Sequence, residues 1–137
     1  MPDKNDVRRA LFRAAETTDK KDFRLTSKSA AGYYASRLMK DSPRGYAYVL
    51  LLDRKSRVRR AVCVKKGGTD TDLVSEIEKA LAGRDFSSFI VVHNHLGNPT
   101  TPSSEDIAVT DYLMKKYPSL FAGHYVTSDF DYTLINR

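Results

Sequence analysis

The pattern of apolar and polar positions predicts a sheet built around two buried strands. Residues 46–52 and 86–92 are largely apolar runs of strand length, as expected of strands that are covered on both faces. Residues 57–65 place Val58, Val62 and Val64 on one face and should pair with the first run as an antiparallel hairpin. Residues 121–127 and 132–135 predict a second hairpin that closes the fold.

Helical spacing of apolar residues predicts four helices, which end near residues 17, 39, 83 and 116. Gly83 stands where a glycine often ends a helix. The capping candidates, in chain order, are Asn5 or Asp6, Thr26 or Ser27, residues 69–72, and Ser103 or Ser104. This order of elements predicts a mixed α/β (α+β) fold, in which helices pack against a largely antiparallel sheet.

The length of 137 residues suits one domain. A polar stretch at 17–22 separates the first helix from the rest, so we divide the chain into an N-terminal helical arm, residues 1–21, and a domain, residues 22–137. No apolar run approaches the roughly 20 residues of a membrane span, and the N-terminus lacks the apolar core of a secretory leader. Together with a single cysteine, Cys63, these features favour a cytoplasmic protein without membrane attachment.

The net charge of +6 changes the picture only slightly. Arg57, Arg59 and Arg60 lie close together and could neutralise phosphates, which permits weak nucleic-acid binding. Because no nucleic-acid-binding motif accompanies them, a solvated basic face is the favoured interpretation. The bare edge of the predicted sheet could also pair with a second copy, so a dimer is compatible with the sequence.

The residues that carry chemistry follow the second buried strand. His93 and His95 are two positions apart at the strand end, so their side chains point to one side. Asp106 stands in the first turn of the next helix, where a loop containing glycine and proline can return it to the histidines. Two imidazoles, one carboxylate and an open fourth position describe a catalytic zinc site, whose bound water could attack a carbonyl. Ser103 could hydrogen-bond that water or an oxyanion, or act only as the helix cap.

The spacing His93-x-His95, seven residues, Ser103, two residues, Asp106 resembles the JAMM signature of JAB/MPN metalloproteases. The RadC branch of that family is especially similar, although the segment LGNP at 96–99 departs from its usual Pro-Ser-Gly. The upstream segments LTSKSAAGYYASRL and YVLLLDRKSRVRRA and the downstream segment AGHYVTSDFDYTLI also look like RadC, so the resemblance covers about residues 22–137. It implies a cytidine-deaminase-like JAB/MPN fold, one Zn²⁺ and hydrolysis of an amide or isopeptide bond. Its name also suggests a link to DNA repair.

One departure from the family bears on activity. Active JAMM enzymes carry a glutamate on an earlier strand as the general base, and alignment places that position near residues 61–63. No acidic residue occurs between Arg54 and Thr69. A general base typically contributes about 10²- to 10⁴-fold to the rate. The other nearby carboxylates, whose simpler role is solvated charge at a helix start, are Asp70, Asp72 and Glu105.

Two further residues are candidates for the surroundings of the metal. Cys63 could project toward it, although a small buried apolar side chain is the simpler interpretation. His124 stands where the family often has a histidine, and it is more simply a strand residue packed near the site than a fourth ligand.

The sequence therefore supports two hypotheses. The first is a zinc-dependent metallopeptidase-like hydrolase acting on a peptide, isopeptide or similar amide. The second is a non-catalytic module that keeps the metal and binds a protein or DNA partner. The intact ligand set favours the first hypothesis, and the missing glutamate favours the second.

Overall fold

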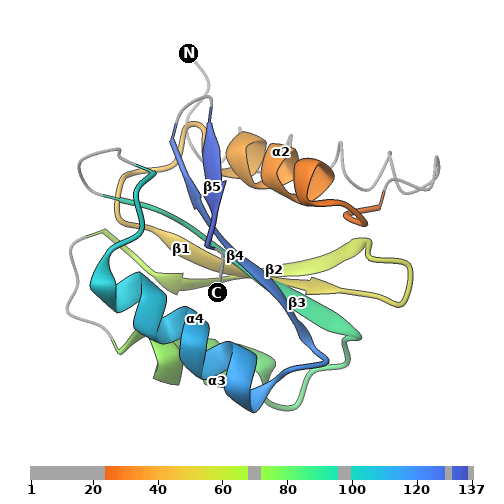
Figure 1. Ribbon diagram of the computed structural model, residues 1–137. Coiled ribbons are helices and arrows are strands. Elements are labelled where there is room, and N and C mark those ends of the chain that lie inside the picture. The colour runs from red at the N-terminus through yellow and green to blue at the C-terminus, as the bar shows by residue number, and fades with distance from the viewer. Residues whose placement is uncertain (1–23, 68–71, 96–99, 129–130, 136–137) are drawn as a thin grey trace.

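A computed structural model describes residues 24–67, 72–95, 100–128 and 131–135 (Figure 1). The predicted N-terminal arm, residues 1–21, lies outside these residues. Within them, three helices and five strands follow one another as α2 (Lys28–Met39), β1 (Ala47–Leu52), β2 (Val58–Lys65), α3 (Leu73–Leu81), β3 (Ser88–Asn94), α4 (Ser104–Lys116), β4 (Phe121–Thr127) and β5 (Tyr132–Leu134). No helix in the described part of the chain is long and apolar enough to cross a membrane.

The strands form one sheet in the order β2-β1-β3-β4-β5. The pairs β1–β2, β1–β3 and β4–β5 are antiparallel, whereas β3 and β4 run parallel. A parallel pair needs a crossover connection, and α4 provides it between β3 and β4. The predicted α+β architecture with a largely antiparallel sheet is confirmed.

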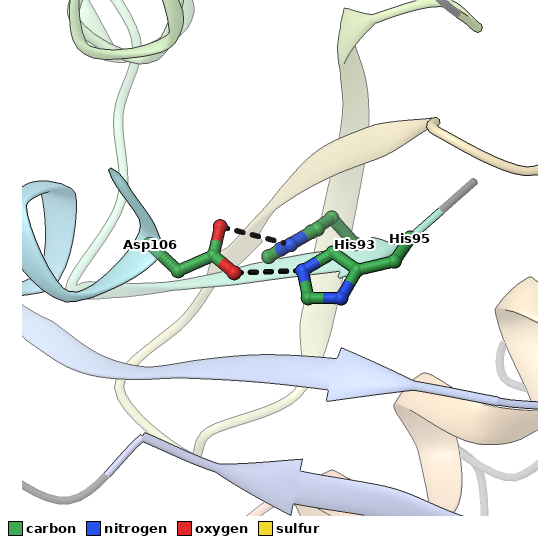
Figure 2. Close-up of side chains that lie close together, drawn as sticks. All are labelled: His93, His95 and Asp106. Carbon is green, nitrogen blue, oxygen red and sulfur yellow. Dashed lines mark hydrogen bonds and ion pairs between the residues drawn. The ribbon is translucent and has the colours of Figure 1, made fainter. Parts of the chain in front are cut away.

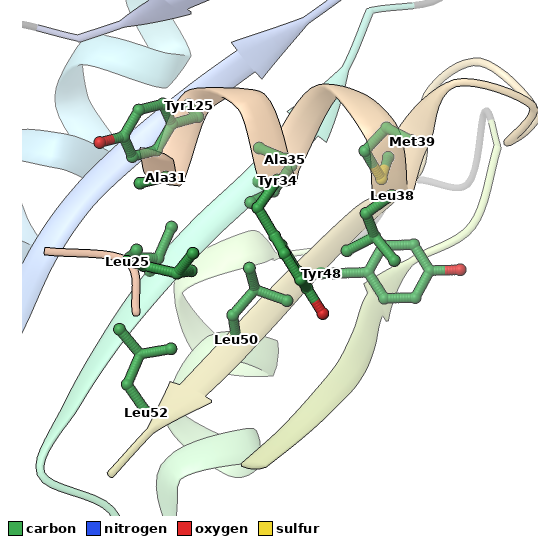
Figure 3. Close-up of a cluster of buried hydrophobic side chains, with 12 residues drawn as sticks. Leu25, Ala31, Tyr34, Ala35, Leu38, Met39, Tyr48, Leu50, Leu52 and Tyr125 are labelled. Carbon is green, nitrogen blue, oxygen red and sulfur yellow. The ribbon is translucent and has the colours of Figure 1, made fainter. Parts of the chain in front are cut away.

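Helices cover both faces of this sheet, with α2 on one side and α3 and α4 on the other (Figure 1). Every residue of β1 is buried, because this strand has a neighbour on each edge and helices on each face. That position explains its unbroken apolar run. One core lies between α2 and the sheet, where Leu38 packs near Leu50 and Tyr48 (Figure 3). The second core lies under α3 and α4 and includes Ile77, Val91 and Leu113.

The helix starts follow from their caps. The Ser27 hydroxyl accepts a hydrogen bond from the Ala30 N–H, and the Asp72 carboxylate accepts one from the Ser75 N–H. Ser103 caps α4, the element that follows β3 in the chain. The carboxyl end of β3 and the N-terminus of α4 are neighbours (Figure 1), and this junction carries the candidate site.

Candidate metal centre

Two elements supply three converging side chains. His93 is the last residue but one of β3 and is only 7% exposed, and His95 follows directly after the strand. Asp106 lies in the first turn of α4 and is 6% exposed. A capping box fixes its carboxylate, since Asp106 Oδ2 accepts the Ser103 N–H at 2.8 Å while Ser103 Oγ accepts the Asp106 N–H at 3.1 Å.

The carboxylate of Asp106 meets one histidine with each oxygen (Figure 2). His93 Nε2 lies 3.2 Å from Oδ1, and His95 Nε2 lies 2.7 Å from Oδ2. One ligand atom from each of the three residues falls within 4.8 Å of the others. The structure thus brings together the three residues that the motif singled out.

These contacts hold Asp106 in its charged form. Burial raises the pKa of its carboxyl group, but the hydrogen bond and charge of His93, the Ser103 N–H and the His95 hydrogen bond outweigh it and leave the pKa well below its usual range. An ionised carboxylate between two imidazole nitrogens is the form that binds a metal cation.

The donor set fits a divalent metal of the zinc type. Zinc takes imidazole nitrogen and carboxylate oxygen as ligands, with bonds of about 2.0–2.2 Å in tetrahedral geometry. Such bonds separate neighbouring ligand atoms by about 3.3 Å. The 3.2 Å between His93 Nε2 and Asp106 Oδ1 already matches that spacing. The 2.7 Å between His95 Nε2 and Asp106 Oδ2 must widen by about half an ångström. His95 follows β3 and its side chain is 19% exposed, so a small side-chain movement can provide this change.

The three side chains open into a cleft of about 350 Å³. Its walls include Leu73 at the start of α3, Lys65 at the end of β2, and Ser103 and Glu105 at the start of α4. A metal held here would therefore face a space large enough for a ligand. Asp72 caps α3 and is not part of this wall, and Asp70 lies outside the described residues.

Lys65 is the residue of β2 that shares a sheet row with His93. Ala47 on β1 pairs with Lys65 on one side and with His93 on the other. The register between β1 and β2 shifts at this point. The β2 residue in the row of His93 is therefore Lys65, which lies just beyond the segment 61–63 where the resemblance places the family's glutamate.

Cys63 lies on the opposite face of the sheet from this cleft. Its side chain packs with the core under α2, and its thiol donates a 3.4 Å hydrogen bond to the Lys65 carbonyl oxygen. It therefore contributes to packing beside Tyr48, with which it pairs across the strands, and not to the surroundings of the histidines.

His124 lies directly behind the ligands. Its Nε2 is 2.7 Å from His93 Nδ1, and its Nδ1 is 3.0 Å from Thr110 Oγ1. The imidazole is completely buried. Burial and the neighbouring His93 lower its pKa well below the usual range, although Asp106 opposes the shift, so His124 is neutral.

Thr110 is a residue that the sequence analysis missed. It lies four residues after Asp106, on the same face of α4, and its hydroxyl donates to the Asp106 carbonyl oxygen at 2.9 Å. The spacing of four residues from Asp106 within a predicted helix was the sequence signal that could have placed Thr110 near the site.

The basic residues of β2 lie apart from the cleft. Arg57 and Arg59 each approach Asp53 with Nε 2.9 Å from its Oδ2, and Arg60 is exposed. Asp53 thus offsets part of the positive charge that suggested a nucleic-acid surface.

Comparisons with known proteins agree with the motif. The profile of the family described as "RadC-like JAB domain" matches residues 25–120. A UPF0758 protein of Pelobacter propionicus is 37% identical over 92 residues, which are 66% of this chain and 40% of that protein. A UPF0758 protein of Coprothermobacter proteolyticus is 36% identical over 86 residues, 61% of this chain and 36% of that protein. One of Staphylococcus aureus is 34% identical over 89 residues, 64% of this chain and 41% of that protein.

The matched part of the chain thus spans about two fifths of the length of these curated relatives. The profile match covers most of the chain, including every residue of the motif from His93 to Asp106. The resemblance seen in the sequence is confirmed, and this chain belongs to the family of RadC-like JAB domains.

Proposed function

We propose that this domain binds one zinc ion through His93, His95 and Asp106 and hydrolyses an amide bond of a peptide or isopeptide. The observation that carries the proposal is the convergence of the three donors on one point at the wall of a cleft. A closed structural site would surround its metal with four protein ligands, whereas three ligands and an accessible side are typical of a catalytic site. Zinc bound in this way supplies an acidified water at neutral pH and polarises a carbonyl.

In this proposal Ser103 stabilises the charge that develops on the substrate oxygen. Its Oγ accepts the Asp106 N–H, so the hydroxyl proton remains available to a ligand in the cleft. Because the capping box holds the side chain in place before a substrate arrives, the donor costs little reorganisation during the reaction.

Among the residues that the structure describes, Glu105 is the carboxylate that lines the cleft in addition to Asp106. It lies in the first turn of α4 and is exposed, so it can turn toward the ligands. We assign it the proton-accepting role that the family's glutamate fills on the earlier strand. A carboxylate in this position can accept a proton from a molecule bound in the cleft.

Metal content and activity should be measured together. The purified protein should contain about one zinc per chain, and His95→Ala should remove it. Glu105→Gln should keep the zinc and lower hydrolysis of a panel of peptide and isopeptide substrates by about 10²-fold or more. The matched control is Glu76→Gln, which changes a glutamate in the first turn of α3 and should leave the rate unchanged. A wild-type protein that binds no zinc contradicts the proposal.

A second candidate is a metal-binding module without hydrolytic activity. Lys65 favours it, because a cationic side chain lines the cleft from β2 and cannot accept a proton in its charged form. On this alternative the metal holds the junction of β3 and α4 in place for a protein or DNA partner. Full zinc occupancy with no hydrolysis of any substrate in the panel would support the module.

A further inference from the structure

Behind the candidate metal site, hydrogen bonds link Thr110, His124 and His93 in one line. We infer that Thr110 and His124 are positioning residues that fix the tautomer of His93, so that its Nε2 lone pair faces the metal position. The inference rests on the metal binding proposed above and concerns residues that do not touch the metal themselves.

The direction of the line is set at Thr110. Its hydroxyl has a single proton, and the Asp106 carbonyl oxygen, 2.9 Å away, can only accept. The proton therefore points to that carbonyl oxygen. The 3.0 Å contact between Thr110 Oγ1 and His124 Nδ1 must then use the proton of Nδ1, with the hydroxyl oxygen as acceptor.

The position of the proton on His124 determines the direction of its hydrogen bond with His93. A neutral imidazole has one N–H and one lone pair, so a proton on Nδ1 leaves the lone pair on Nε2. His124 is 0% exposed, and a charged imidazole there would lose its hydration without a carboxylate in direct contact. The 2.7 Å contact with His93 therefore runs from His93 Nδ1–H to His124 Nε2.

The consequence appears at the other nitrogen of His93. With its proton on Nδ1, Nε2 directs a lone pair at Asp106 Oδ1, 3.2 Å away. Two electron-rich atoms at this distance need a positive centre between them, which is either a proton on Nε2, as in the ion pair with Asp106 described above, or a metal ion that replaces this proton. The opposite direction of the line would place the proton of His93 on Nε2 and block the ligand atom. Partners that orient a metal-bound histidine in this way typically contribute about 10- to 100-fold to metal affinity.

Thr110→Val tests the line without removing a ring. The variant keeps the shape of the side chain and deletes the group that holds the proton on His124 Nδ1. The zinc dissociation constant, measured by competition with a chelator, should rise about 10- to 100-fold, and Thr110→Ser should restore it. Thr127→Val is the matched control, because its buried hydroxyl donates to the backbone oxygen of His93, not to the ring, and it should bind zinc as the wild type does.

Nitrogen-15 NMR of the histidines reads the tautomer directly. In the zinc-loaded wild type, His124 should carry its proton on Nδ1, and in Thr110→Val that population should decrease. Equal zinc affinity in Thr110→Val and Thr127→Val overturns the inference and leaves the proposed function intact. So does a His124 proton found on Nε2 in the wild type. Failure of the wild type to bind zinc overturns both.

Discussion

Lys65 and His93 lie in one row of the sheet, with Ala47 of β1 between them. Both side chains line the same cleft. Lys65 is thus the β2 residue next to the candidate metal site. A carboxylate at this position could reach a metal-bound water.

Lys65→Glu should therefore raise hydrolysis if the domain lacks only an efficient base. We expect an increase of about 10-fold or more over the wild type at neutral pH, within the range that a general base contributes. Initial rates on the same peptide and isopeptide panel provide the measurement, with zinc content checked in parallel. Lys66→Glu adds the same charge next to it in the chain and serves as control. Equal rates in both variants would count against this account of the β2 position.

Asp106→Asn should abolish high-affinity metal binding. The amide keeps an oxygen that can accept the Ser103 N–H, but it loses the negative charge between the two imidazoles. We expect a loss of zinc affinity larger than the roughly 10- to 100-fold typical of outer partners, measured by chelator competition. Glu105→Gln, which neutralises the neighbouring carboxylate, should retain the zinc. Stoichiometric zinc in purified Asp106→Asn would show that the three residues do not form the site.

Asp53 should make the fold sensitive to acid. Partial burial raises the pKa of its carboxyl group, but the N–H groups of Arg57 and Lys55 and the Arg57 guanidinium lower it to about 2. A pKa below the unfolded value stabilises the folded state above about pH 4, and this contribution is lost as the pH falls toward 2.

Asp53→Asn should accordingly lower the free energy of unfolding by about 1 kcal/mol at pH 7. The difference from the wild type should shrink to near zero at pH 2. Urea unfolding across this pH range gives the measurement. A difference that stays constant with pH would mean that the charge of Asp53 is not the source.

The core under α4 should be sensitive to truncation at Leu113, which is 0% exposed. Leu113→Ala leaves a cavity among packed side chains and should destabilise the fold by about 2–5 kcal/mol. The next residue, Met114, is 39% exposed, so Met114→Ala should cost less than about 1 kcal/mol. Thermal or urea unfolding of the two variants checks the contrast, and equal losses would contradict the packing described for this helix.

Much of the fold could be predicted from local patterns. The apolar runs predicted β1 and β3, and the cap residues Ser27 and Ser103 fixed the starts of α2 and α4. The spacing from His93 to Asp106 predicted the three residues that converge. Each of these depends on neighbours in the chain, which is why the sequence alone was sufficient.

The remaining features depend on pairing between distant segments. The register shift of β2 that brings Lys65 level with His93 has no local sequence signal. The parallel pairing of β3 with β4 brings His124 behind His93, and the sequence predicted only that these two histidines lie near each other. Cys63 faces the core under α2 for the same reason, since only the pairing of β2 with β1 decides which face it joins.

The parallel pairing of β3 with β4 also has a consequence for the order of assembly. His93 and His124 are 31 residues apart in the chain, and a contact of such separation forms only after the loop between its ends has closed. A nascent or partly unfolded chain can thus present the two histidines of the motif to a metal before the ring of His93 has been oriented. Tight metal capture should therefore report completed folding of the sheet, not merely the presence of the motif.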